Sequence, residues 1–316
     1  METGILAGFF AEVMASSVSL TYHLRMSIIS THQLTKTYGD KDAVHSLDLG
    51  IAAGEIFGFL GPNGAGKTTT IRLLLGLIQP TSGSAEIFGL DTRHHSVEIH
   101  KRLAYIPGES NLWGSLTGKQ TLDLLGALHG EIDPAYQKEL IDRFQLEPQK
   151  KVRAYSKGNR QKLLIIAGLA SRSNVLLLDE PTTGLDPLMQ EVFRSAIFEA
   201  KSRGQTVFLS SHTLSEVEVL CDRVALLRNG QLIETGTLDQ MRHLSALTYQ
   251  ITFADQPVDL SRVENVKRVV VEGPRVTCEV AGKPTALLRV LADANVVRVV
   301  SHEPSLEEIF LSHYGN

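Results

Sequence analysis

Short, continuously apolar stretches alternate with longer amphipathic ones through the first three-quarters of the chain. Runs such as 55–60 and 175–178 are typical of strands buried on both faces, whereas 68–77 has apolar residues at helical spacing. Strands that alternate with helices favour a parallel α/β fold. The predicted strands are 28–37, 43–51, 55–60, 175–178 and 206–210, and the predicted helical regions are 68–77 and 97–170, with loops at 107–114 and 149–159.

The last part of the chain has a different pattern. Runs rich in β-branched residues predict strands at 248–253, 267–271, 275–280 and 296–300, and helical spacing predicts helices at 287–294 and 305–314. We therefore expect an N-terminal extension at 1–25, an α/β domain at 26–243 and a small α+β domain at 244–316. The α/β domain is expected to carry an inserted helical subdomain at about 97–170.

The N-terminal extension lacks this periodic pattern. Glu12 interrupts its apolar stretch, and Glu2 has the wrong sign for the positively charged start of a secretory signal. We expect residues 1–25 to be either disordered or absent from the native protein, with Met26 as the true start. The alternative, a helix resting on a membrane surface, is disfavoured because the stretch is short and has no cationic face.

Composition and charge narrow the class of protein. With 43% hydrophobic and 21% charged residues, the 316-residue chain has an ordinary globular composition. The longest apolar run, 163–170, is far shorter than the roughly 18 residues that a membrane span needs. A net charge of −4 gives no global basic field, so we expect no nucleic acid partner. Two cysteines, Cys221 and Cys278, cannot form a disulfide framework and favour a reducing cytoplasm.

A phosphate-loop pattern, G-x-x-x-x-G-K-[ST], occupies residues 61–68 between a predicted strand and a predicted helix. Glycines let consecutive backbone N–H groups turn towards phosphate oxygens, and the positive end of the following helix dipole faces the same anion. We expect Lys67 to reach the β- and γ-phosphates and the Thr68 hydroxyl to bind Mg²⁺. An ordinary glycine-rich turn is the alternative, but it does not require the full pattern in this context.

A pair of acids follows the buried run 175–178. We expect Asp179 to hold Mg²⁺, directly or through water, and Glu180 to polarise the attacking water as a general base. Most adjacent acid pairs are simply solvated. The position of this pair, at the end of an apolar strand and downstream of a phosphate loop, favours the catalytic interpretation.

Further motifs are more specific. The segment 154–161 reads Ala-Tyr-Ser-Lys-Gly-Asn-Arg-Gln, 184–187 reads Gly-Leu-Asp-Pro, and a Ser-His pair follows the strand predicted at 206–210. With these motifs in this order, the chain after Met26 resembles the nucleotide-binding subunit of an ABC transporter. In that resemblance 154–161 corresponds to the signature, usually Leu-Ser-Gly-Gly-Gln, Asp186 belongs to the D-loop, His212 is the switch histidine, and Tyr38 is the aromatic residue that stacks on adenine.

The resemblance implies a P-loop NTPase core of the ABC type that hydrolyses ATP with Mg²⁺. It also implies a homodimer, or a pair of nucleotide-binding subunits, in which each ATP lies between the phosphate loop of one copy and the signature of the other. His212 would then bond the γ-phosphate and hold the water together with Glu180. The implied ATP-binding residues are Tyr38, Gly61, Pro62, Asn63, Gly64, Ala65, Gly66, Lys67, Thr68 and Thr69, and those of the signature, acting in trans, are Ser156, Lys157, Gly158 and Asn159.

The chain departs from the family pattern in two places. The signature has Lys157 for its first glycine and Asn159 for its glutamine, within a basic cluster at 150–162 that is either a solvated face or, through Lys157, a support for the facing triphosphate. In the Q-loop, Gly108 stands where the family usually has a glutamine that touches Mg²⁺ and the transmembrane partner, and Glu109 follows one residue late. The second departure puts the coupling role in doubt more than ATP binding.

The segment 303–314 is similar to the tail of ATP-binding subunits that serve ABC-2-type exporters, including those for antibiotic resistance and antibiotic export. This similarity implies a separate membrane permease and a peripheral position on the inner face of the cell membrane. Leu112, Trp113 and Leu116 are candidate contacts with the permease, although Trp113 is at least as well explained by packing within the helical subdomain.

Two other classes of P-loop protein are the alternatives. A soluble ABC-type ATPase that acts on nucleic acid or ribosomes typically has paired ATPase domains, a coiled-coil insertion or a zinc module, whereas this chain has one phosphate loop and no cysteine cluster. A P-loop GTPase or kinase would lack the signature and the switch histidine. The motifs therefore favour an exporter ATPase.

Overall fold

The computed structural model describes residues 27–108, 112–130, 132–244 and 247–302, without the side chains of 242–244. The extension expected at 1–25, Glu109 of the Q-loop and the helix expected at 305–314 lie outside these residues. The chain divides into two compact units between Glu234 and Thr235. This division lies nine residues before the domain limit expected at 243/244, and each unit is described by itself.

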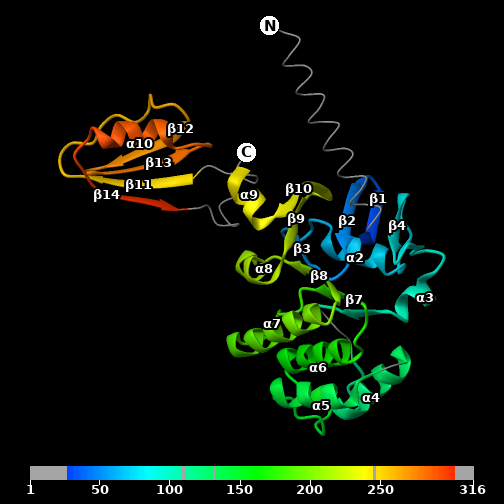
Figure 1. The fold of residues 1–316 in the computed structure, drawn as a ribbon. Helices are drawn as coiled ribbons and strands as arrows, with labels where there is room; N and C mark the ends of the chain where they lie inside the picture. Colours follow the sequence, from blue (N-terminus) through cyan, green and yellow to red (C-terminus); the bar gives the residue numbers. More distant parts are fainter. Residues whose placement is uncertain (1–26, 109–111, 131, 245–246, 303–316) are drawn as a thin grey trace. The chain divides into compact units, whose positions relative to one another are not determined.

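An antiparallel sheet opens the first unit (Figure 1). It has the order β2-β1-β4-β5, and the strands expected at 28–37 and 43–51 are confirmed as β1 and β2. Gly39, with a φ of 57°, lies in the turn between them and adopts a conformation that suits glycine. The strands are β1 (Ser27–Tyr38), β2 (Lys41–Ala52), β4 (Ser82–Ile87) and β5 (Leu90–Asp91).

The central sheet of the first unit has the order β10-β9-β3-β8-β7-β6. β3 pairs in parallel with β8 and β9, and β7 pairs in parallel with β6 and β8, so the carboxyl ends of these strands share one edge. All residues of β3, β7 and β8 are buried, as their apolar runs predict. The strands are β3 (Ile56–Leu60), β6 (Leu103–Ile106), β7 (Val175–Asp179), β8 (Thr206–Ser211), β9 (Arg223–Arg228) and β10 (Gln231–Thr237).

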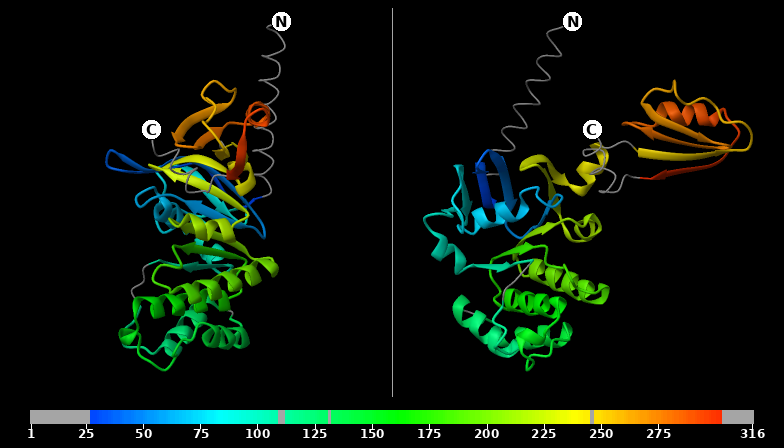
Figure 2. Two further views of the ribbon diagram at one scale, coloured as in Figure 1. Left: turned by 90° about the vertical axis from the view of Figure 1, so that its left-hand side faces the viewer. Right: turned by 180° about the vertical axis from the view of Figure 1, so that it is seen from behind.

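Helices surround the central sheet, and Figure 2 shows them from two further sides. α5 and α4 pack on α6, and α6 packs on α7 and β6. One expectation was wrong: the region 97–170 is not helical throughout, because 103–106 forms β6, whose four residues are too few to interrupt a helical pattern visibly. The helices are α2 (Lys67–Leu74), α3 (Ser96–His100), α4 (Gly118–His129), α5 (Pro134–Arg143), η1 (Val152–Ala154), α6 (Lys157–Ala170), α7 (Pro187–Ser202) and α8 (Leu214–Leu220).

The second unit is a four-stranded antiparallel sheet of order β12-β13-β11-β14 with helix α10. Tyr249, Ile251, Cys278 and Leu287 belong to its hydrophobic cluster, whose members all come from residues 247–296. The strands and the helix expected between 248 and 300 are confirmed. The elements are α9 (Leu238–Leu244), β11 (Leu247–Phe253), β12 (Val266–Glu272), β13 (Arg275–Val280), α10 (Thr285–Ala292) and β14 (Val296–His302).

Within the described residues, no helix combines the length and the apolar character that crossing a bilayer requires. Cys221 and Cys278 are both buried and unbridged, and burial raises the pKa of each thiol. The two cysteines are therefore unreactive packing residues of their respective units.

Candidate functional site

The loop between β3 and α2 places its backbone as the phosphate-loop pattern requires. Gly66 has a φ of 108°, and a Cβ atom there would lie 2.4 Å from the carbonyl oxygen of Ala43, so no other residue fits without moving the backbone. Ala65 N donates to Pro62 O at 3.1 Å, and Gly230 N donates to Ala65 O at 3.0 Å. The loop consists of Gly61, Pro62, Asn63, Gly64, Ala65 and Gly66, and Lys67, Thr68 and Thr69 begin α2.

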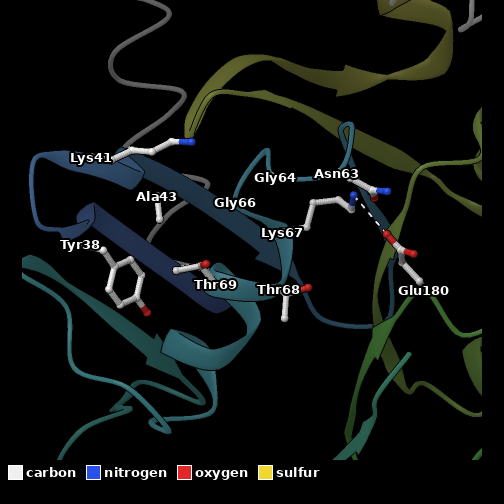
Figure 3. A pocket seen from close by; sticks show the side chains of 10 residues that line it. All are labelled: Tyr38, Lys41, Ala43, Asn63, Gly64, Gly66, Lys67, Thr68, Thr69 and Glu180. Atoms are coloured by element: carbon white, nitrogen blue, oxygen red, sulfur yellow. Dashed lines mark ion pairs between the residues drawn. The ribbon is translucent and has the colours of Figure 1, made fainter. Parts of the chain in front are cut away.

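Lys67 is 5% exposed, although it carries a charge. Its Nζ atom donates to the carbonyl oxygens of Gly61 at 2.7 Å and Pro62 at 3.3 Å, and it lies 3.2 Å from Oε1 of Glu180 (Figure 3). The ammonium group is thus held at the inner wall of the loop by acceptors on two sides. This position lets it turn towards an anion bound by the loop.

The two acids at the end of β7 have different surroundings. Asp179 is 6% exposed, and its Oδ1 atom accepts a hydrogen bond of 2.6 Å from the hydroxyl of Ser210 on the neighbouring strand β8. Glu180 has a φ of 48°, which is uncommon for a residue with a side chain, and its N atom donates to Ser210 O at 3.0 Å. Ser210 therefore fixes both acids, one through its side chain and one through its backbone.

His212 follows β8, and its Nδ1 atom lies 3.1 Å from Oε2 of Glu180. Lys67 contacts the other oxygen of the same carboxylate, so the Glu180 carboxylate lies between an ammonium group and an imidazole ring. The imidazole ring is about half exposed. The adjacent strands β7 and β8 bring Glu180 and His212 together, which explains how residues 32 positions apart meet at one edge of the sheet.

A cavity of about 380 Å³ lies beside the phosphate loop (Figure 3). Tyr38 lines one side of it with a half-exposed ring, and Lys36 Nζ lies 5.1 Å from the centroid of that ring. Sequence reasoning missed Lys41, which also lines the cavity. The signal was available, because the two-residue turn after β1 places Tyr38 and Lys41 opposite each other in the register. The lining residues are Tyr38, Lys41, Ala43, Asn63, Gly64, Gly66, Lys67, Thr68, Thr69 and Glu180.

A second cavity, of about 370 Å³, shares Asn63, Thr68 and Glu180 with the first. Thr68, Asp179 and Glu180 are among the residues that line it. Burial together with the negative charge of Asp179 raises the pKa of Tyr105 to about 12. The described residues contain no group of three or more His, Cys, Asp or Glu side chains able to hold a metal alone. The lining residues are Asn63, Thr68, Arg72, Tyr105, Pro107, Gly108, Lys157, Asp179, Glu180 and Thr183.

Gly108, at the position expected to belong to the Q-loop, lies against the acid-bearing strand. A Cβ atom on Gly108 would lie 2.6 Å from the carbonyl oxygen of Asp179. The segment before it is held by α6, because Gln161 Nε2 donates to Pro107 O at 3.3 Å. A residue with a side chain does not fit at 108 unless this segment moves.

The signature segment starts α6. Ser156 caps the helix and accepts from Asn159 N at 3.2 Å, and a Cβ atom on Gly158 would lie 2.5 Å from the carbonyl oxygen of Gly184 in the D-loop segment. Asp186 caps α7 and accepts from Met189 N at 3.0 Å. Of the described signature residues, Lys157 alone lines the second cavity of its own chain.

The remaining expected features lie at the surface of the helical region. Trp113 is 51% exposed, and Leu112 and Leu116 are partly exposed, so packing within the helical region leaves much of the indole ring uncovered. In the basic cluster, Lys157 is exposed together with Lys150, Lys151 and Arg153, whereas Arg160 and Lys162 are partly buried.

Two family models match the chain. The model described as ABC transporter matches residues 44–183, and the model described as ATP-binding protein DrrA1-3-like, C-terminal domain, matches residues 236–314. The first match includes the phosphate loop, the signature segment and the acid pair. The second covers most of the second compact unit.

Similar proteins cover most of the chain. The chain is 39% identical over 237 residues to the bacitracin transport ATP-binding protein BcrA of Bacillus licheniformis, covering 73% of this chain and 76% of that protein. It is 33% identical over 309 residues to the daunorubicin/doxorubicin resistance ATP-binding protein DrrA of Streptomyces peucetius, covering 91% and 92%. A solved ATP-binding subunit of an ABC transporter superposes with a TM-score of 0.64 at 30% identity, covering 68% of this chain and 92% of that one. The chain belongs to the ATP-binding subunits of ABC transporters, which are ATPases of the P-loop fold.

Proposed function

We propose that this chain energises export of a drug or antibiotic through a separate ABC-2-type permease, on the cytoplasmic face of the cell membrane. The names of the bacitracin and daunorubicin relatives support a substrate of this class, and the match of residues 236–314 to a DrrA-like C-terminal domain supports the same type of exporter. The half-exposed Trp113 is the proposed anchor for the permease, because exposed aromatic residues are typical interface anchors.

In the proposed nucleotide site, Tyr38 stacks on adenine while the backbone of 61–66 and the amino end of α2 bind the phosphates. Lys67 turns from Glu180 towards the β- and γ-phosphates. Thr68 and Asp179 would hold Mg²⁺. This assignment fits the second cavity, because its donors are hard oxygen atoms and Mg²⁺ normally combines one or two protein ligands with substrate phosphates. Bound Mg²⁺ would neutralise charge that develops on the phosphate oxygens.

The hydrolytic step is assigned to Glu180. Its carboxylate takes a proton from the attacking water, and His212, 3.1 Å away, holds the water and the γ-phosphate in place. The observation that carries the proposal is that one carboxylate lies between Lys67 and His212, at the junction of the two cavities. A structural ion pair alone would not place this carboxylate on the lining of both cavities.

The other half of the site comes from a second copy of the chain. We assign Ser156, Lys157, Gly158 and Asn159 to the γ-phosphate of the facing subunit, with the amino end of α6 aimed at it and Asp186 near the dimer seam. Ser156 and Lys157 are exposed and are therefore available to a partner. The ammonium group of Lys157 would add charge where a glycine offers only a backbone dipole.

Trapping the ATP-bound dimer tests this proposal. Glu180→Gln is expected to bind ATP and form a stable dimer without releasing phosphate, and Lys157→Ala in that background is expected to weaken the dimer and reduce its sensitivity to salt. Purification of the trapped dimer from membranes should recover a polytopic protein, and Trp113→Ala should lose it while still binding ATP. Phosphate release at the wild-type rate, or recovery of ribosomes or DNA, would contradict the proposal.

A further inference from the structure

A third carboxyl group, Glu216 on α8, is bonded to the strand end that carries His212. The hydroxyl of Ser211 donates to Glu216 Oε2 at 2.9 Å, and Ser211 Oγ accepts from Thr213 N at 2.9 Å. Ser211 and Thr213 are the two neighbours of His212 in the chain. One carboxylate therefore fixes the backbone on both sides of His212 through a single buried hydroxyl.

The same carboxyl group also meets the segment that follows Glu180. The hydroxyl of Thr182 lowers the pKa of Glu216, and Leu185 N donates to Thr182 O at 3.0 Å in the turn that leads to Asp186. Thr182, Thr213 and Glu216 line a shared cavity of about 250 Å³. Glu216 is thus the point at which the loop carrying His212 and the D-loop segment are joined.

The charge of Glu216 is energetically unfavourable. Burial raises its pKa above the ordinary value of 4.5, while the hydroxyls of Ser211 and Thr182 and the positive charge of His212 act in the opposite direction. Its Oε1 atom is buried and has no hydrogen-bond partner within bonding distance among the described residues. Because a buried acceptor without a partner lowers the free energy of unfolding, packing alone does not explain a glutamate at this position.

We propose that Glu216 is a positioning residue that joins the His212 loop to the D-loop segment and thereby holds His212 within reach of Glu180. It acts through Ser211 and Thr182 and does not touch the nucleotide. The inference rests on the proposed roles of Glu180 and His212. It predicts that loss of the carboxylate slows hydrolysis without weakening ATP binding.

The test is Glu216→Gln, which keeps the size of the side chain and one acceptor oxygen. We expect kcat to fall on the order of tenfold, KM for ATP to change less than about twofold, and the Tm to stay equal or rise. A merely structural role predicts that kcat and Tm fall together. Glu98→Gln, which removes an exposed carboxylate on α3, is the matched control and should leave all three quantities unchanged.

A double-mutant cycle with Ser211→Ala separates the contact from other effects. We expect the two substitutions to be strongly non-additive in kcat, because Ser211→Ala removes and Glu216→Gln weakens the same hydrogen bond. A wild-type kcat for Glu216→Gln, a parallel loss of Tm, or additive effects would overturn the inference. If Glu180→Gln instead hydrolyses ATP at the wild-type rate, the proposed function itself fails, which distinguishes the two failures.

Discussion

The hydroxyl of Ser210 donates to Asp179 Oδ1 at 2.6 Å, and Ser210 Oγ also accepts from Glu180 N at 3.2 Å. One residue of β8 thus contacts the carboxylate of Asp179 and the backbone of Glu180 at the end of β7. Asp179 is nearly fully buried, so this hydrogen bond satisfies one of its oxygens. The two acids therefore depend on β8, which follows them in the sequence and is not part of their motif.

Ser210→Ala should therefore weaken both the fold and the reaction. The buried oxygen of Asp179 would lose its donor, which we expect to lower the free energy of unfolding by about 1–3 kcal/mol and kcat on the order of tenfold. Thermal unfolding and phosphate release measure the two effects. A variant with unchanged phosphate release would show that Asp179 does not need this donor.

Glu180→Gln should abolish turnover while preserving the site. General base catalysis typically contributes a factor of about 100 to 10,000, so phosphate release should fall by at least about 100-fold. The amide oxygen still accepts from Lys67, so ATP binding should persist. Single-turnover phosphate release and nucleotide retention on a desalting column measure this, and turnover within about tenfold of wild type would exclude Glu180 as the base.

Gly108→Ala should disturb the metal side of the site. The added Cβ atom meets the carbonyl oxygen of Asp179 at 2.6 Å, and backbone atoms at this distance must move apart. We expect a higher Mg²⁺ concentration for half-maximal activity, measured by titrating the ATPase rate with Mg²⁺. The matched control is Gly114→Ala, whose Cβ atom meets the Arg153 Cβ atom at 3.2 Å; an equal change in both variants would contradict the prediction.

The stability of Glu216→Gln should depend on pH with a definite sign. Because the folded-state pKa of Glu216 lies above its ordinary value of 4.5, the wild type loses stability as pH rises from that value through the folded pKa. The glutamine variant lacks this loss, so its Tm advantage should grow as pH rises above 4.5 through the folded-state pKa of Glu216. The facing titratable groups, His212, Glu180 and Cys221, are present in both proteins. A constant or shrinking difference would contradict the assignment.

Leu287→Ala should act on the second unit alone. Leu287 is fully buried in the cluster of residues 247–296, and its truncation should lower the free energy of unfolding of that unit by about 2–5 kcal/mol. Calorimetry is expected to resolve two transitions. ATP should shift only one of them, and the substitution should shift only the other. Loss of the ATP-dependent transition would show that the two units unfold together.

Much of the candidate site was predictable because its chemistry is local in sequence. The phosphate loop and the acid pair each occupy a few consecutive residues at the end of a buried strand. The strand β7 was also predictable. Its apolar residues 175–178 are consecutive and leave no polar positions from which an amphipathic helix could form. The role of each residue remains a prediction that the experiments above address.

Other features depend on tertiary neighbours and leave no local pattern. Ser210 and Glu216 look like ordinary strand and helix residues, and their significance comes from the pairing of β7 with β8 and the packing of α8. The strand β6 was missed because its four residues lie within a region dominated by helices. Gly108 was recognised as unusual, but only the distance to Asp179 shows why a glycine fits there.

The hydrophobic cluster of the second unit draws its members from residues 247–296, so that unit closes on itself. A unit of this kind is exchangeable during evolution: recombination after β10 would keep the central sheet and this cluster intact while joining the same ATPase domain to a different C-terminal unit. On the proposed function, a change of exported substrate would then alter the permease and this unit while the residues assigned to hydrolysis stay constant.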